Sequence, residues 1–156
     1  MRIESFLSQS PIFQVNRIAR RMGASLNLIL AGEGLTVVES LLLAAIFFEK
    51  RGAIKPSQLA KTFETTKSNI SHSISSLEAK ELVQRRIDPD DARAFRLVLL
   101  PRGKRQAVRV VGILDRLQRH FEAELGSAEL HSMLERMAGL EAICARLATQ
   151  RGPTPE

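Results

Sequence analysis

The sequence of 156 residues is poor in cysteine and has no long hydrophobic run, and each shortage excludes a class of protein. Its single cysteine, Cys144, cannot form an intrachain disulfide, which favours a reducing compartment. The longest apolar stretch, 41–48, is far shorter than the roughly 20 residues that span a bilayer. The N-terminal segment is interrupted by Glu4 and serines, unlike a signal peptide. We therefore expect a cytoplasmic protein that does not bind membranes.

Motifs of catalysis and metal binding are missing as well. Residues 26–34 resemble the strand and first glycines of a dinucleotide fingerprint, but Val37 stands where the third glycine is needed. His120 and His131 are separated by an expected helix break, which is not the spacing of metal ligands. The sequence thus predicts no enzyme, no catalytic residue, no cofactor and no metal site.

Positive charge is in excess. The chain has 23 Lys and Arg against 17 Asp and Glu, a net charge of +6. The excess is concentrated between Arg85 and Arg109, where eight basic residues face three acidic ones. A basic segment of this kind favours a polyanionic partner such as nucleic acid.

Apolar residues at helical spacing, punctuated by proline, glycine and capping residues, predict a mainly α-helical chain. Thr36 and Glu39 form a capping box in front of a helix that is apolar nearly all round and must be buried. Thr65 or Thr66 caps a later helix that has one apolar stripe. The expected helices cover about 11–30, 41–48, 56–63, 67–80, 104–125 and 128–150.

After Leu82 the apolar period changes from 3.6 residues to two. Residues 83–87 and 95–100 each alternate as strands do, and Asp, Pro and Ala residues at 88–94 supply a turn. The two strands are expected to pair antiparallel, as a small β-hairpin wing with an exposed tip. The expected order of elements is that of a winged helix-turn-helix: a helix, a short helix, a turn, a helix and a charged hairpin.

The residues of this segment resemble the MarR (multiple antibiotic resistance regulator) family from about Leu35 through Gly103. The resemblance rests on PSQLA at 56–60, KSNIS at 67–71, LE at 77–78, LV at 82–83 and DPDDAR at 88–93. The Asp-x-Arg of the wing, followed by LVL at 97–99 and Gly103, is its most specific part. The family often has glycine where this chain has Glu64 and Glu81, so we expect those turns to differ locally.

The resemblance implies one MarR-like domain over 1–156, with a winged helix-turn-helix lobe at 35–103 and N- and C-terminal dimerisation helices at 1–34 and 104–150. It further implies a homodimer that binds a pseudo-palindromic double-stranded DNA operator, represses transcription and is released by a small aromatic or anionic effector. Arg17, Arg20 and Arg21 could meet such an anion, but could equally be exposed charges or phosphate contacts.

An α-helix fits the major groove, and the helix at 67–80 turns small hydrogen-bonding side chains away from its apolar stripe. Arg93 at the hairpin tip suits a narrow minor groove. The expected DNA-binding residues are Lys55, Ser57, Lys67, Ser68, Asn69, Ser71, His72, Ser75, Arg86, Arg93 and Arg96.

Other interpretations of the same residues stay open. A serine-rich helix face can be merely solvated, and Arg93 can be an ion-pair partner of Asp91. The winged helix could serve as a protein-interaction module that binds an acidic partner instead of DNA. Cys144, near the last apolar stripe, is expected to be a buried, inert thiol.

Overall fold

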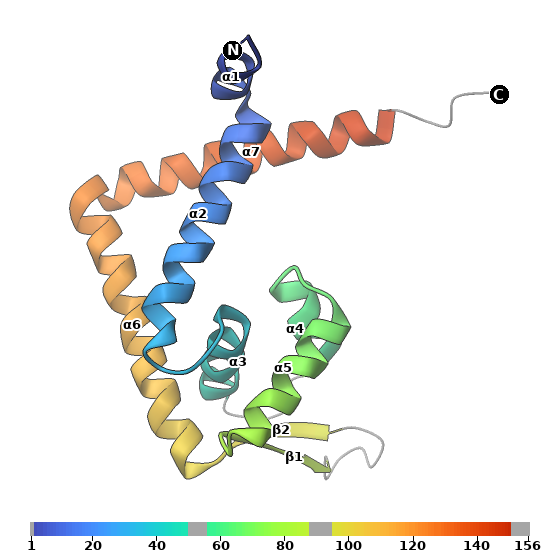
Figure 1. Cartoon of the computed structure of the whole chain (residues 1–156), viewed down its shortest axis with the longest axis vertical. Helices are drawn as coiled ribbons and strands as arrows, with labels where there is room; N and C mark the ends of the chain where they lie inside the picture. The colour runs from blue at the N-terminus through green and yellow to red at the C-terminus, as the bar shows by residue number, and fades with distance from the viewer. Residues whose placement is uncertain (1, 50–55, 88–94, 151–156) are drawn as a thin grey trace, which may run out of the picture. The chain divides into compact units, whose positions relative to one another are not determined.

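The structure, a computed structural model, describes residues 2–49, 56–87 and 95–150. Helices dominate this part of the chain, and one pair of strands interrupts them (Figure 1). The elements are α1 (Arg2–Gln9), α2 (Pro11–Ala31), α3 (Val37–Phe48), α4 (Pro56–Thr62), α5 (Lys67–Ala79), β1 (Val83–Ile87), β2 (Phe95–Leu99), α6 (Pro101–Leu125) and α7 (Ser127–Gln150). The mainly helical fold with a hairpin wing is therefore confirmed. The sequence had not predicted α1, and α6 begins at Pro101 rather than Lys104.

The chain divides into two compact units, which are described separately. One comprises Ile18–Leu114, and the other combines Met1–Arg17 with Asp115–Glu156. The division falls within α2 and α6, so each of these helices contributes to both units. Within the described residues, no helix has the length and apolarity that a membrane span requires.

The unit Ile18–Leu114 contains a continuous hydrophobic core. From here on this whole unit, which includes the segment 35–103, is called the lobe. Leu42 and Leu43 of α3, Ile74 and Leu77 of α5, and Val110 of α6 are almost completely buried in it. Side chains of α4 and both strands complete the cluster. The predicted burial of the apolar helix is confirmed for its first part, but Phe47 and Phe48 at the end of α3 are exposed and contact each other edge to face.

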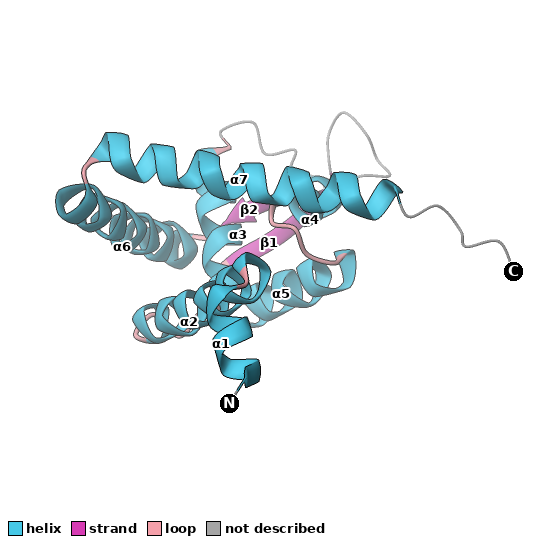
Figure 2. Cartoon of the chain, turned by 90° about the horizontal axis from the view of Figure 1, so that it is seen from above, coloured by secondary structure: helices cyan, strands magenta, loops and turns pink. Residues whose placement is uncertain are grey.

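The two strands, drawn in magenta in Figure 2, pair as an antiparallel ribbon. Their register pairs Val83 with Leu99 and Ile87 with Phe95. Since alternate residues share a face, Val83, Leu97 and Leu99 all point to the core, where they are buried. At the far end of the same face Ile87 and Phe95 are exposed. The hairpin is thus anchored at its base by apolar contacts.

Side-chain caps fix the beginnings of two helices in the lobe. At α3 the Thr36 hydroxyl accepts the N–H of Glu39, and the Glu39 carboxylate accepts the N–H of Thr36, which confirms the capping box. At α5 the choice between two threonines is settled in favour of Thr66, whose hydroxyl accepts the N–H of Asn69.

The turns that end α4 and α5 were expected from the sequence to differ locally, and this expectation is wrong. Glu64 and Glu81 adopt positive φ angles of 49° and 56°, so both turns keep the left-handed conformation. The N–H of Leu82 bonds the Leu77 carbonyl, and the N–H of Thr65 bonds the Ala60 carbonyl. These 6→1 bonds are those of a Schellman motif, and they offset the cost of about 1 kcal/mol for a residue with a Cβ.

Gly103 permits a close approach between α6 and the chain just before β1. A Cβ at this position would lie 1.9 Å from the carbonyl oxygen of Leu82. That carbonyl also accepts the N–H of Leu100, so it cannot easily turn away. Glycine is therefore required here by packing rather than by its φ angle.

The second unit is different, because α1 and α7 bury no residue at all. Large apolar side chains repeat along one side of α7 and remain exposed: Met133, Met137, Leu140, Ile143 and Leu147. Cys144 lies on this stripe and is exposed too. The expectation of a buried thiol is wrong for the single chain, in which Cys144 is exposed.

Candidate nucleic-acid interface

Helix α5 separates an apolar face from a polar one as the sequence predicts. Ile70, Ile74 and Leu77 are buried together with Ser73. The hydrogen-bonding residues expected to meet DNA are all exposed on the rest of the helix: Lys67, Ser68, Asn69, Ser71, His72 and Ser75. The lobe thus presents a continuous polar surface on a helix that its core holds in place.

The first turn of α5 is organised by two threonines. The Asn69 carboxamide nitrogen donates a hydrogen bond to the Thr65 hydroxyl over 2.8 Å, while the Asn69 backbone N–H is bound by Thr66. One of the two amide hydrogens of Asn69 is thereby used, and the second remains for a base edge. The side chain is held at the N-terminal end of the helix, where contacts to bases are usually made.

The hairpin places its arginines on both of its faces. Arg86 and Arg96 are directly opposite each other in the register, so they share a face. Arg86 is exposed and donates from Nε to the Gln84 side chain over 3.3 Å, whereas Arg96 is half-buried. Of this expected pair, Arg86 is thus the more accessible to a phosphate.

Arg85 lies on the other face of the hairpin, against α5. Its Nη1 is 3.0 Å from Oε2 of Glu78, and its Nη2 is 3.3 Å from the Ser75 hydroxyl oxygen. The backbone N–H of Arg85 donates to the second carboxylate oxygen of Glu78. Sequence reasoning missed this residue, although the strand alternation that placed Val83 and Leu97 inward also placed Arg85 on their side.

Three expected DNA-binding residues cannot be placed. Lys55 and Arg93 lie outside the described residues, as does Asp91, the alternative partner of Arg93. Ser57 belongs to α4, but its side chain is outside what the structure describes. Their contribution to a binding surface stays a prediction from the sequence.

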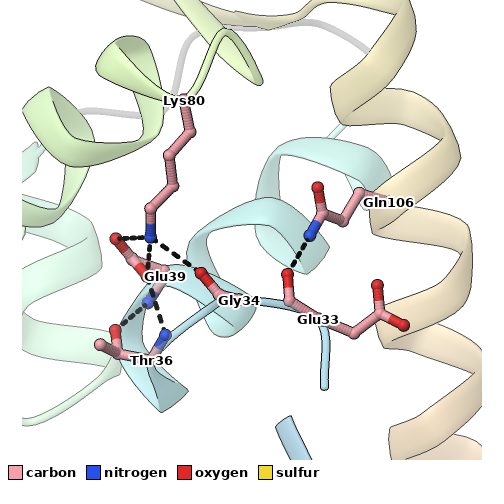
Figure 3. A network of polar contacts seen from close by, with 6 residues as sticks. All are labelled: Glu33, Gly34, Thr36, Glu39, Lys80 and Gln106. Atoms are coloured by element: carbon pink, nitrogen blue, oxygen red, sulfur yellow. Dashed lines mark hydrogen bonds and ion pairs between the residues drawn. The ribbon is translucent and has the colours of Figure 1, made fainter. Parts of the chain in front are cut away.

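A polar junction joins the end of α5 to the beginning of α3 (Figure 3). The Lys80 ammonium donates to both carboxylate oxygens of Glu39 at 2.8 Å and to the Gly34 carbonyl at 3.0 Å. Burial raises the pKa of Glu39, but hydrogen bonds from Lys80, Ser76 and the Thr36 N–H, with the charge of Lys80, outweigh it and lower the pKa below its ordinary value. Glu39 is therefore a buried carboxylate kept ionised by its partners.

Neighbouring contacts tie the same loop to α6. The Gln106 carboxamide donates to the Glu33 carbonyl, and Nε of Arg109 is 2.9 Å from the Glu33 carboxylate. Figure 3 shows Glu33 and Gly34 side by side in the segment that these polar groups hold. The segment between α2 and α3 thus connects the recognition helix candidate α5 with α6.

The arginines considered for an anionic effector are all exposed on α2. Arg17 donates from Nη2 to the Gln14 side chain at 2.6 Å, which occupies part of its guanidinium. Arg17 lies in one unit and Arg20 and Arg21 in the other. These positions leave the three interpretations of the arginines open.

A comparison with protein families finds a match that lies within the lobe. A family model described as MarR family matches residues 36–95. Residues 36–95 of the lobe therefore resemble the MarR family. The matched range runs from the capping threonine of α3 to the first residue of β2, so it contains α5 and the strand that carries Arg85.

Solved structures of low sequence identity share the fold of this chain. The S. aureus MepR–DNA complex has 17% identity and a TM-score of 0.75, and covers 86% of this chain and 96% of its own. CouR from Rhodococcus jostii RHA1 bound to p-coumaroyl-CoA has 20% identity and a TM-score of 0.72, with 86% and 93% covered. A MarR family transcription regulator has 23% identity and a TM-score of 0.75, with 96% and 97% covered. Comparison with curated proteins found no significant match.

Proposed function

We propose that this protein is a transcription regulator that binds double-stranded DNA through α5 and the hairpin of its MarR-like lobe. The observation that carries the proposal is the exposed polar face of α5, held by a buried core beside a hairpin with arginines on both faces. DNA recognition needs this combination, because base edges are read by hydrogen bonds in the major groove while cations bind phosphates. MepR, which shares the fold, is in complex with DNA.

The proposed contacts divide into two classes. Asn69, His72 and the serines of α5 are proposed to face base edges and nearby backbone, with Asn69 the best suited to discriminate among bases. Lys55, Lys67, Arg86 and Arg96 are proposed for phosphates, and Arg93 for the minor groove.

The regulator is proposed to act as a homodimer in the cytoplasm, without catalysis. The uncovered apolar stripe of α7 supports a second copy as its partner, in agreement with the dimerisation role expected for 1–34 and 104–150. A twofold dimer would recognise a pseudo-palindromic operator whose half-sites lie about 34 Å apart, one turn of the duplex. Blocking a promoter in this way would repress transcription.

We further propose that binding of a small effector releases the protein from its DNA operator. CouR, with the same fold, is bound to p-coumaroyl-CoA, an aromatic and anionic molecule. An effector can release DNA only to the extent that it prefers a lobe arrangement unable to bind the operator. Binding of candidate ligands should therefore weaken operator binding and be weakened by the operator in equal measure.

Selection of bound fragments from genomic DNA tests the function. We expect a common, pseudo-palindromic sequence to be enriched, and binding to it to survive excess competitor DNA. Asn69→Ala should weaken specific binding by about 1 to 3 kcal/mol and relax the preference at one base position. Gln118→Ala is the matched control, since Gln118 is an exposed carboxamide on α6 that bonds only Glu122 among the described contacts.

The alternative, a module that binds an acidic protein, predicts another result. Such a module would show only weak DNA binding without sequence preference and with a steep dependence on salt. Enrichment of no common sequence, together with loss of binding near physiological salt, would contradict the proposed function.

A further inference from the structure

We propose that Arg85 is a phosphate-contacting residue of the DNA surface and that Glu78 positions it there. This inference rests on the proposed function and adds to it a residue from the strand that packs against α5. Its starting point is the contact between Arg85 and Ser75, because Ser75 belongs to the exposed face of α5. A guanidinium that reaches the Ser75 hydroxyl must lie on that same face.

The charge of α5 shows why such a residue is needed. Apart from Lys67 at its beginning and Glu78 near its end, the helix has no Lys, Arg, Asp or Glu. The two charges cancel, so the side chains of α5 alone carry no net charge toward phosphate. The carboxylate of Glu78 would even repel the backbone of a duplex that lay along the last turns of the helix.

Arg85 reverses this balance. Its guanidinium neutralises Glu78 at 3.0 Å and brings a cation to the C-terminal half of the polar face. A guanidinium has five N–H donors, of which Glu78 and Ser75 use two, and 39% of the side chain is exposed. Donors therefore remain for a phosphate oxygen while the group is held in place.

Glu78 holds Arg85 by two separate contacts. One carboxylate oxygen accepts the backbone N–H of Arg85 at 3.1 Å, and the other binds its guanidinium. The carboxylate thus fixes both the strand and the direction of the side chain. This reduces the side-chain entropy that Arg85 would lose when DNA binds.

The salt dependence of DNA binding tests the phosphate contact. Binding of the full chain to a long mixed-sequence duplex is measured over a range of salt concentrations for wild type, Arg85→Met and Arg119→Met. Arg119 is the matched control, because it also pairs with a carboxylate at 2.9 Å but lies on α6 beyond the MarR-matched residues. For Arg85→Met we expect about 10-fold weaker binding at low salt and a slope of log affinity against log salt that is smaller by about 0.9 for each bound lobe. For Arg119→Met we expect no change in slope.

A second variant pair tests the role of Glu78. In Arg85→Met the Glu78 carboxylate faces the duplex uncompensated, so adding Glu78→Gln should restore part of the affinity but none of the lost slope. An ion pair remote from the duplex would not give this rescue, and the lost slope reports the phosphate contact of Arg85 itself. Thermal unfolding of each variant confirms that the lobe is folded, and Arg85→Lys, which keeps the charge, should retain the slope if Arg85→Met unfolds.

The outcomes separate the two proposals. If wild type binds no DNA, both the function and this inference are wrong. If wild type binds but Arg85→Met keeps the wild-type slope, or Glu78→Gln gives no rescue, the inference alone is wrong.

Discussion

The two units of the chain differ in how far they bury their apolar side chains. One is the lobe, and the other combines Met1–Arg17 with Asp115–Glu156. The lobe closes a core inside one chain, with Leu42, Ile70 and Leu77 completely buried. Helix α7 has apolar residues at comparable spacing but buries none of them. An apolar helix face contributes to stability only when another surface covers it. The lobe is therefore self-sufficient, while α7 is suited to association with another surface.

The largest effect is expected where α7 would meet its partner. Leu140→Glu places a carboxylate on the apolar stripe, and in the proposed dimer each copy would bury it without a counter-charge. We expect the dimer to be weakened by about 3 kcal/mol or more, which is over 100-fold in the dissociation constant. Analytical ultracentrifugation at several concentrations measures this. Ala138→Glu, on the opposite side of α7, should leave association unchanged, and equal behaviour of the two variants would contradict the proposed interface.

A glycine substitution contrasts the two regions directly. Gly103→Ala puts a Cβ against the Leu82 carbonyl, and we expect a loss of roughly 2 to 3 kcal/mol in unfolding free energy. Gly139→Ala in α7 meets no atom within 4 Å and should gain about 0.5 to 1 kcal/mol from helix propensity. Urea unfolding of both variants checks this. Similar values would mean that the close approach at Gly103 is not needed.

Acid should weaken the lobe through Glu39 more than it weakens α7. The pKa of Glu39 is lowered in the folded state, so its stabilising contribution is complete above its ordinary pKa of 4.5 and is lost as the pH falls through the lower, folded value. We expect Glu39→Gln to cost about 1 to 2 kcal/mol at neutral pH and to flatten the fall in stability below pH 4.5.

Urea unfolding between neutral and acid pH measures the effect of Glu39. Glu135→Gln is the control, because Glu135 forms an exposed i,i+4 pair with His131 on α7. A loss of stability in acid that is as steep in Glu39→Gln as in wild type would show that other groups cause it.

The smallest effect concerns the left-handed turn after α5. Glu81→Gly removes the cost of a Cβ at a φ of 56°, and we expect it to stabilise the lobe by about 0.5 to 1 kcal/mol. Glu141→Gly, in the middle of α7, should destabilise by about 1 kcal/mol instead. Shifts of the unfolding temperature in opposite directions are the expected result, and a destabilised Glu81→Gly would contradict the assigned strain.

Most of the lobe could be predicted from the sequence because its signals are local. The capping box at Thr36, the Pro56 helix start, the stripe of Ile70, Ile74 and Leu77 and the strand alternation each act within a few residues. The polar face of α5 follows from the same periodicity. Strand alternation places Arg85 on the side of Val83, but only packing shows that this side brings its guanidinium to Ser75 of α5.

By itself, the sequence determined which segments become helix or strand, apart from α1, and which faces of them are apolar, since backbone geometry ties both to residue spacing. Tertiary structure alone decided the partners of the polar groups. Lys80 meets Glu39 and Gly34 across more than 40 residues of chain, and Glu33 meets Gln106 and Arg109 across more than 70. Such pairings depend on how the core orients whole elements, which no local pattern contains. The turns at Glu64 and Glu81 stay left-handed for a local reason, since the 6→1 hydrogen bonds at the ends of α4 and α5 outweigh the preference of one residue.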